Sequence, residues 1–136
     1  MNDEHPALLA SYSSWSCVHR KSKEEWLNLF DDDAVIEDPI GVSGLDPTGL
    51  GQRGKEAISA FWDSNIGPNT VRIEMHNSYA AGLEAAHLGT IRTTLPDGTT
   101  LAVDGIFTYR VNESGKLVSL RGFWDIDEMK VESADS

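Results

Sequence analysis

The feature that most constrains the fold is a series of four strand-like segments in the second half of the chain. Beyond Pro68, stretches in which apolar and polar residues alternate are separated by short turns rich in Gly, Asn and Asp. The predicted strands cover residues 71–79, 85–94, 99–111 and 116–124. Because short turns place consecutive strands side by side, this pattern predicts a meandering antiparallel sheet.

The first half of the chain predicts helices and one short strand. Apolar residues recur at three- and four-residue steps over residues 6–18, 22–30 and 55–64. Ser22 followed by Glu25 is a capping box, and the first two helices are expected to pack as a hairpin. A strand is predicted at 34–37. The loop at 40–54 holds five glycines, and its length indicates a lid or a pocket rim.

These elements predict one α+β domain over residues 1–136, since a chain of this length builds one core. Helices that are all N-terminal to a meander must cover one face of its sheet. The expected shape is a cone, with a curved antiparallel sheet as the inner wall and the first and third helices as a lid. Such a cone favours a mostly apolar small-molecule pocket. If Trp124 faces inward, alternation predicts the same for Gly122, Leu120 and Val118. Phe107, Tyr109 and Val111 are expected to share one face of the preceding strand.

The charge of the chain excludes some partners. Eleven basic and 22 acidic residues give a net charge of −11, which repels nucleic acid and anionic membrane surfaces. The N-terminus lacks an apolar leader segment, so a cytoplasmic location is expected. Cys17 is the single cysteine, which fits a reducing compartment. The four histidines show no metal-ligand spacing, and we expect no metal and no cofactor. The tail at 132–136 is expected to be frayed.

Asp38 is the best candidate for a chemically active residue. It follows the apolar pair Val35-Ile36 and precedes Pro39, so its carboxylate is expected at the edge of the interior. Removing water disfavours the charged form and makes the carboxylate more basic, as a general base requires. An Asp-Pro pair is also typical of a turn that the Asp side chain caps, and spacing alone leaves both interpretations open.

Three segments resemble the bacterial steroid Δ-isomerases, within the wider nuclear transport factor 2-like or SnoaL-like superfamily. They are residues 26–41, which contain Glu-Asp-Pro, residues 54–62, and the hairpin at 109–124. The resemblance implies a cystatin-like cone of the ketosteroid isomerase type, which often pairs into a homodimer through the outer face of the sheet. It also implies that Asp38 moves a proton from the carbon beside a carbonyl group to a more distant carbon, through a dienolate.

The sequence departs from that family at the groups that stabilise the dienolate oxygen. In those isomerases a tyrosine and a protonated aspartic acid donate hydrogen bonds to this oxygen. Ser14 stands at the tyrosine position, with Tyr12 and Trp15 nearby, and Phe107 stands at the aspartic acid position. Two further tyrosine positions hold Phe30 and Trp62. The candidate replacement donors are the Ser14 hydroxyl and the indole N–H groups of Trp15, Trp62 and Trp124.

Two functions follow from this resemblance. The first is a steroid Δ-isomerase-like enzyme, with Asp38 as base on a neutral, hydrophobic, carbonyl-containing substrate. The second is a non-catalytic or weakly catalytic binding protein for steroid-like or other apolar ligands. The expected substrate-binding residues are Tyr12, Ser14, Trp15, Phe61, Trp62, Phe107 and Trp124.

Overall fold

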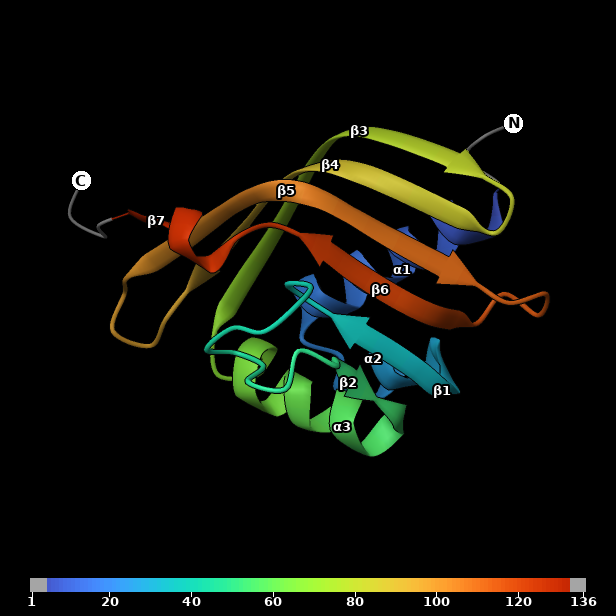
Figure 1. Ribbon diagram of the computed structural model, residues 1–136, viewed down its shortest axis with the longest axis horizontal. Coiled ribbons are helices and arrows are strands. Elements are labelled where there is room, and N and C mark those ends of the chain that lie inside the picture. Colours follow the sequence, from blue (N-terminus) through green and yellow to red (C-terminus); the bar gives the residue numbers. More distant parts are fainter. Residues whose placement is uncertain (1–4, 133–136) are drawn as a thin grey trace.

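The computed structural model describes residues 5–132, which form one curved sheet with helices packed against it (Figure 1). The helices are α1 (Pro6–Arg20), α2 (Lys23–Asn28) and α3 (Gly54–Phe61), the last continued by the π-helical turn Trp62–Ile66; a 3₁₀ turn spans Ile126–Glu128. The strands are β1 (Phe30–Glu37), β2 (Gln52–Arg53), β3 (Thr70–Ala81), β4 (Glu84–Thr94), β5 (Thr100–Val111), β6 (Leu117–Phe123) and β7 (Lys130–Glu132).

The sheet is mixed rather than antiparallel throughout. Its strand order is β2-β1-β6-β5-β4-β3, with β7 paired to β5. The meander β3 to β6 is antiparallel as predicted, but β1 pairs with β6 in parallel, with Ile36 opposite Leu120. The short-turn rule fixes only strands that are neighbours in sequence. It says nothing of β1, which joins the meander from the other end of the chain.

Two paired glycines mark the bend that turns the sheet into a cone. Gly89 on β4 lies opposite Gly105 on β5. A Cβ atom on Gly89 would lie 2.6 Å from the Met75 Cα atom of β3, beside the register shift that begins at Met75. On Gly105 it would lie 2.6 Å from the carbonyl oxygen of Phe123. Glycine therefore permits the close backbone approach that a strongly bent sheet requires.

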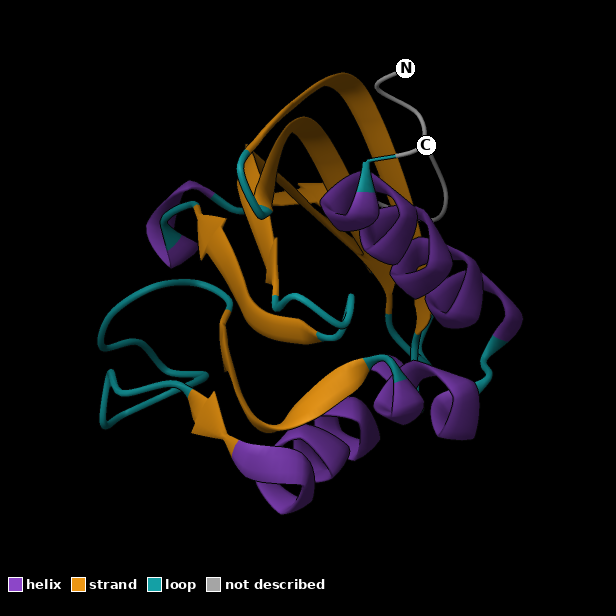
Figure 2. Ribbon diagram, turned by 90° about the vertical axis from the view of Figure 1, so that its right-hand side faces the viewer, coloured by secondary structure: helices purple, strands orange, loops and turns teal. Residues whose placement is uncertain are grey.

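The helices close the concave side of this sheet, and the core lies between the helices and the sheet. α1 contacts β3, β4 and β5, while α3 packs against β1. In the side view of Figure 2 the strands curl over and the long N-terminal helix lies across the open side. α1 and α2 contact each other, as predicted for a hairpin. The capping box is not formed, because the Ser22 side chain makes no cap hydrogen bond and Glu25 pairs with Arg20 at 2.8 Å.

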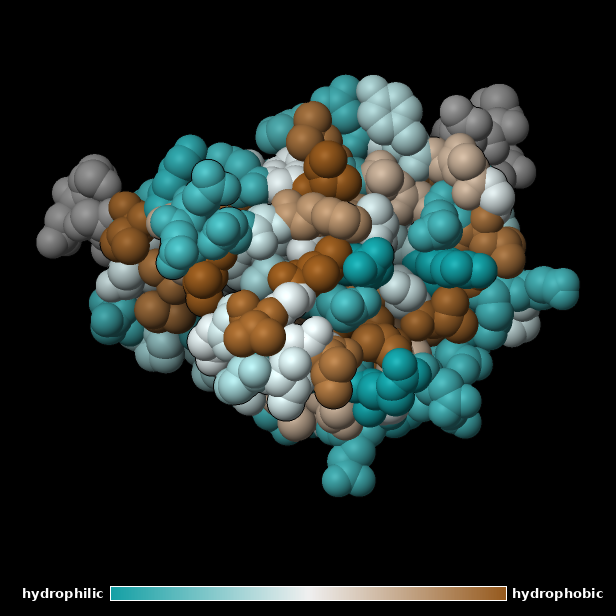
Figure 3. Space-filling model, viewed as in Figure 1, coloured by the Kyte–Doolittle hydropathy of each residue, from teal (hydrophilic) through white to brown (hydrophobic). Residues whose placement is uncertain are grey.

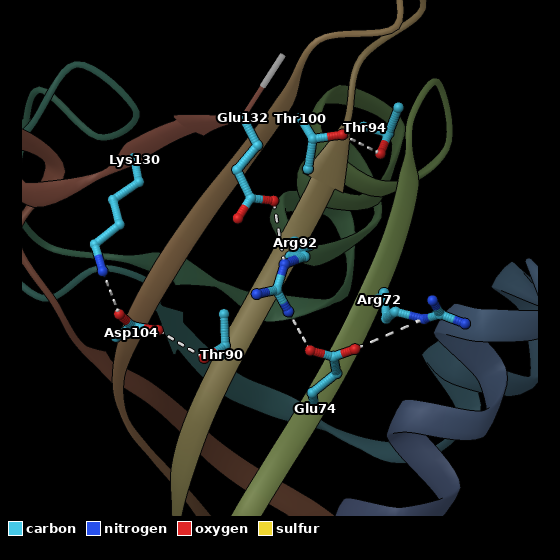
Figure 4. Close-up of polar contacts among 9 residues, drawn as sticks. All are labelled: Arg72, Glu74, Thr90, Arg92, Thr94, Thr100, Asp104, Lys130 and Glu132. Atoms are coloured by element: carbon cyan, nitrogen blue, oxygen red, sulfur yellow. Dashed lines mark hydrogen bonds and ion pairs between the residues drawn. The ribbon is translucent and has the colours of Figure 1, made fainter. Parts of the chain in front are cut away.

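Side-chain polar contacts hold the last strand, β7, in its pairing with β5 (Figure 4). Lys130 pairs with Asp104 at 3.1 Å, and Glu132 pairs with Arg92 at 3.2 Å. Arg92 also pairs with Glu74 of β3. Glu132, the first residue of the predicted frayed tail, thus belongs to β7; the rest of that tail lies outside the described residues. Among residues 5–132, no helix has the length and apolar character to cross a membrane.

Candidate functional site

A cavity of about 300 Å³ lies inside the cone, a volume within the range of small-molecule sites. Its wall comes from all parts of the fold: α1, the end of α3, the loop after β1, and the concave face of the sheet. Leu45 brings the 40–54 loop to this wall, so the loop forms part of the rim, as its length predicted. The apolar lining residues are Val18, Trp26, Leu45, Phe61, Ile66, Val71, Ile73, Ile91, Leu95, Leu101, Val103, Leu120, Trp124 and Met129.

The Asp38 carboxyl group lies in this apolar wall, directly after the end of β1. Burial raises the pKa of Asp38 above its ordinary value. A hydrogen bond from the Trp124 indole Nε1–H to Asp38 Oδ1, at 2.5 Å, lowers that pKa by a smaller amount. The neighbouring Glu37 pairs with Arg121 at 3.1 Å and does not line the cavity. Among residues 5–132, Asp38 is the single carboxylate in the cavity wall.

Gly122 on β6 leaves the space that the Asp38 carboxylate occupies. A Cβ atom at position 122 would lie well inside van der Waals contact with Asp38 Oδ1, and 2.8 Å from Trp124 Nε1. The Ile40 backbone N–H donates to the Gly122 carbonyl at 3.0 Å and holds the chain after Asp38 against β6. The absence of a side chain at 122 is thus what lets β1 and β6 bring the carboxylate and the indole together.

Four of the predicted site residues line the cavity. They are Asp38, Ser14 on α1, Phe61 at the end of α3, and Trp124 after β6. Ser14 is 2% exposed, so its hydroxyl is withdrawn from solvent. The Trp124 indole N–H, expected as a replacement donor, is instead engaged by Asp38.

The other four predicted binding residues do not line the cavity. Tyr12 is 40% exposed and borders a separate hollow with Arg20 and Glu25. Trp15 and Trp62 lie one layer behind the wall: Trp15 donates its indole N–H to Tyr109 at 2.9 Å, and the Trp62 ring packs 5.0 Å from that of Trp26. Phe107 is 1% exposed and sits in the core, opposite Gly122. Periodicity gives the face on which a residue lies, but not its depth behind the surface of a cavity.

Val118, which alternation predicted to face inward, does not line the cavity. A register shift between Arg110 and Val111 interrupts the alternation along β6. Leu117 is fully buried in its place, and Val118 is half-buried. Phe107, Tyr109 and Val111 are all buried, as predicted for one face of β5.

Tyr109 is a polar cavity residue that sequence reasoning did not select, as are Ser64, Asn65, Asn69 and Thr93. It is 3% exposed, and its hydroxyl accepts the Trp15 indole N–H. Burial raises its pKa far above the ordinary value; hydrogen bonding with Trp15 and Ser14 lowers it and the Asp38 charge raises it, both to a smaller extent. The signal that could have found it is its predicted position on the inner face of β5, beside Phe107.

A buried histidine lies behind Trp15, between α1 and the sheet. Ser11 donates its hydroxyl to the Ala7 carbonyl at 2.7 Å, so its oxygen accepts from His87 Nε2–H at 2.9 Å. His87 Nδ1 then accepts from Ser78 at 2.7 Å, which assigns the tautomer. Burial lowers the pKa of His87 to about 4, so the ring is neutral at pH 7. Within residues 5–132, no group of His, Cys, Asp and Glu side chains is arranged to hold a metal ion.

A curved mixed sheet closed by helices around a mostly apolar cavity is the cone fold of the ketosteroid isomerase type. A family profile described as the SnoaL-like domain matches residues 12–120. The chain therefore belongs to the SnoaL-like family, as the resemblance of residues 26–41, 54–62 and 109–124 indicated.

Solved structures support the same assignment. A Δ5-3-ketosteroid isomerase from Mycobacterium sp. is 42% identical, with a TM-score of 0.91 over 94% of this chain and 99% of that chain. A Mycobacterium tuberculosis protein solved in complex with estradiol-17β-hemisuccinate is 43% identical, with a TM-score of 0.90 over 93% and 99% of the two chains. A computationally designed 17-OHP binder is 40% identical, with a TM-score of 0.92 over 96% and 99%.

Proposed function

We propose that this protein is a ketosteroid isomerase-like enzyme and that Asp38 is its general base. The observation that carries the proposal is the half-buried Asp38 carboxylate, which lies in the wall of a mostly apolar cavity with Trp124 as its hydrogen-bond donor. Burial makes this carboxylate a stronger base than a solvated aspartate. The similarity to a Δ5-3-ketosteroid isomerase at 42% identity supports a steroid-like substrate.

In the proposed reaction, Asp38 removes a proton from the carbon that lies between a carbonyl group and a carbon–carbon double bond. The electron pair of the broken C–H bond moves onto the carbonyl oxygen and forms a dienolate. Asp38 then returns the proton to the far carbon of the former double bond, which conjugates the new double bond with the carbonyl. The carboxylate is regenerated, and the reaction is a net isomerisation that consumes no other reactant.

The test is turnover of a Δ5-3-oxo steroid, followed by the ultraviolet absorbance of the conjugated 4-en-3-one product. We expect turnover by the wild-type protein and none by Asp38→Asn. Steroid affinity should be retained in Asp38→Asn. It can be measured by quenching of tryptophan fluorescence, because Trp26 and Trp124 line the cavity in both proteins. Asp32→Asn, at an exposed position of β1, is the matched control and should keep full activity. A wild-type protein without turnover contradicts the enzyme proposal.

The second candidate function is that of a binding protein for steroid-like or other apolar ligands. Two observations favour it: Phe107 carries no polar atom at the position of the oxyanion aspartic acid, and a designed 17-OHP binder is 40% identical to this chain. Tight steroid binding, seen as quenching of tryptophan fluorescence, would support a binding function alone if it occurs without turnover and is unchanged in Asp38→Ala.

We also propose that the protein is a homodimer formed through the outer face of the sheet. Leu88, Ile106 and Phe123 pair across β4, β5 and β6, and they are 47%, 45% and 47% exposed. Figure 3 shows apolar side chains gathered over the middle of this face, which is the face turned toward the viewer in Figure 1. A continuous apolar row on a surface is typical of a protein interface.

A further inference from the structure

The proposed isomerisation requires a hydrogen-bond donor for the carbonyl oxygen, because negative charge develops there as the proton leaves carbon. The position at which the family places an aspartic acid holds Phe107, which is buried outside the cavity wall. The Trp124 indole N–H is engaged by Asp38, and that of Trp15 by Tyr109. The donor must therefore be a different polar group in the cavity wall.

Tyr109 has the geometry of such a donor. Its side chain lines the same cavity as Asp38, and the residue is 97% buried, being 3% exposed. Its hydroxyl oxygen is an acceptor for Trp15 at 2.9 Å, and its hydrogen bond with Ser14 lowers the Tyr109 pKa, as a hydrogen bond donated by the Ser14 hydroxyl to the phenol oxygen does. A phenol has one O–H group, so this proton is directed to whatever occupies the cavity.

The surroundings of Tyr109 keep the phenol protonated and polarised. Burial and the negative charge of Asp38 both raise its pKa, so it remains a donor at neutral pH. The hydrogen bond from Trp15 withdraws electron density from the phenol oxygen, which strengthens the O–H group as a donor. Trp15 is fixed in turn by the edge-to-face contact of its ring with His87, at 4.6 Å between ring centroids.

We propose that Tyr109 donates its hydroxyl proton in a hydrogen bond to the substrate carbonyl oxygen and stabilises the dienolate, with Trp15 as the positioning residue for Tyr109. This inference rests on the proposed function, since it names the electrophilic partner of Asp38. It places the donor on β5, two residues beyond Phe107, in a chain whose α1 carries serine at position 14.

The first test is the steady-state kinetics of Tyr109→Phe with a Δ5-3-oxo steroid. Removal of one oxyanion donor lowers kcat by about 10²- to 10³-fold, and KM should change by only a few-fold because the ring is retained. Tyr79→Phe is the matched control, since Tyr79 is 70% exposed on β3 and does not line the cavity. It should leave kcat and KM unchanged. A Tyr109→Phe enzyme with wild-type kcat overturns the inference and leaves the role of Asp38 intact.

The second test needs no turnover and separates the donor from the base. Testosterone has a single carbonyl group, whose infrared stretching band moves to lower wavenumber when it accepts a strong hydrogen bond. We expect this shift in the wild-type protein and in Asp38→Asn, its loss in Tyr109→Phe, and a smaller shift in Trp15→Phe. Ser14→Ala removes the cavity hydroxyl that hydrogen-bonds with Tyr109 and should keep the shift. Loss of the shift in Ser14→Ala, with its retention in Tyr109→Phe, would assign the donor to Ser14 and overturn the inference.

Discussion

At the scale of single residues, the Asp38 carboxyl group is held in an environment that destabilises its charged form. Trp124 supplies one hydrogen bond, which offsets only part of the effect of burial on the Asp38 pKa. In the part of the chain that the structure describes, no basic side chain lines the cavity to neutralise the carboxylate. A base arranged in this way gains reactivity at the expense of folding free energy.

Asp38→Asn should therefore stabilise the protein at neutral pH. The Asp38 pKa is raised on folding, so the unfolded chain loses its proton first and stability falls as pH rises above about 4. Asparagine cannot ionise, and its Oδ1 atom still accepts from Trp124. The free energy of unfolding in urea at pH 7 should therefore be higher for Asp38→Asn than for the wild-type protein. Below pH 4 the gain should vanish, and equal stabilities at pH 7 would contradict the prediction.

Sequence reasoning selected Asp38 as a candidate site residue and did not select Tyr109, for a physical reason. Asp38 follows a buried strand and precedes a proline, so its place at a strand end and cavity edge follows from local chain geometry. Tyr109 and Phe107 lie on one face of the same strand, and alternation treats them alike. Which of the two reaches the cavity depends on packing with α1 and β6, through Trp15 and Gly122, and those contacts join distant parts of the chain.

At the scale of elements, the close approach of β1 and β6 builds the site, and Gly122 is the residue that permits it. Gly122→Ala should displace the Asp38 carboxylate, because the added Cβ atom would overlap Asp38 Oδ1. A displacement of about 1 Å is enough to lower kcat by roughly 100-fold. Gly44→Ala is the control, since a Cβ atom there meets nothing within 4 Å. Wild-type kcat in Gly122→Ala would show that the strand pair tolerates the methyl group.

The contact between α1 and the sheet should set the acid limit of stability. His87 is neutral in the fold, with its pKa lowered from 6.5 to about 4, so the unfolded chain binds a proton first as pH falls. Stability should decline between pH 6.5 and 4, by at most about 1.4 kcal/mol per pH unit from this residue. Urea denaturation at several pH values should show this slope reduced in His87→Gln. It should persist in His76→Gln, whose side chain is exposed on β3.

The elements themselves were mostly predictable, whereas their long-range pairing was not. The four meander strands lie within two residues of their predicted ends at every boundary, because hydrophobic alternation and turn residues are local signals. β1 begins at Phe30, which the helical period had assigned to the preceding helix. Its parallel pairing with β6 and the addition of β7 to β5 depend on surfaces that exist only after the meander has folded.

At the scale of the whole molecule, the outer face of the sheet makes the proposed dimer testable. Ile106 is central in the exposed row, paired with Leu88 on one side and Phe123 on the other. Ile106→Asp would bury a carboxylate in each half of a symmetric interface and should convert the dimer into a monomer. Leu50→Asp is the control, since Leu50 is 76% exposed in the loop after β1 and is not a member of this row.

Sedimentation velocity should therefore give about twice the chain mass of 14.9 kDa for the wild-type protein and Leu50→Asp, and a single chain for Ile106→Asp. Salt provides an independent check. Each chain has a net charge of −11, so two chains repel each other, and added salt screens this repulsion. The dimer should accordingly tighten as ionic strength rises, because apolar side chains rather than ion pairs form its centre. A wild-type protein that stays monomeric at high salt would contradict the interface.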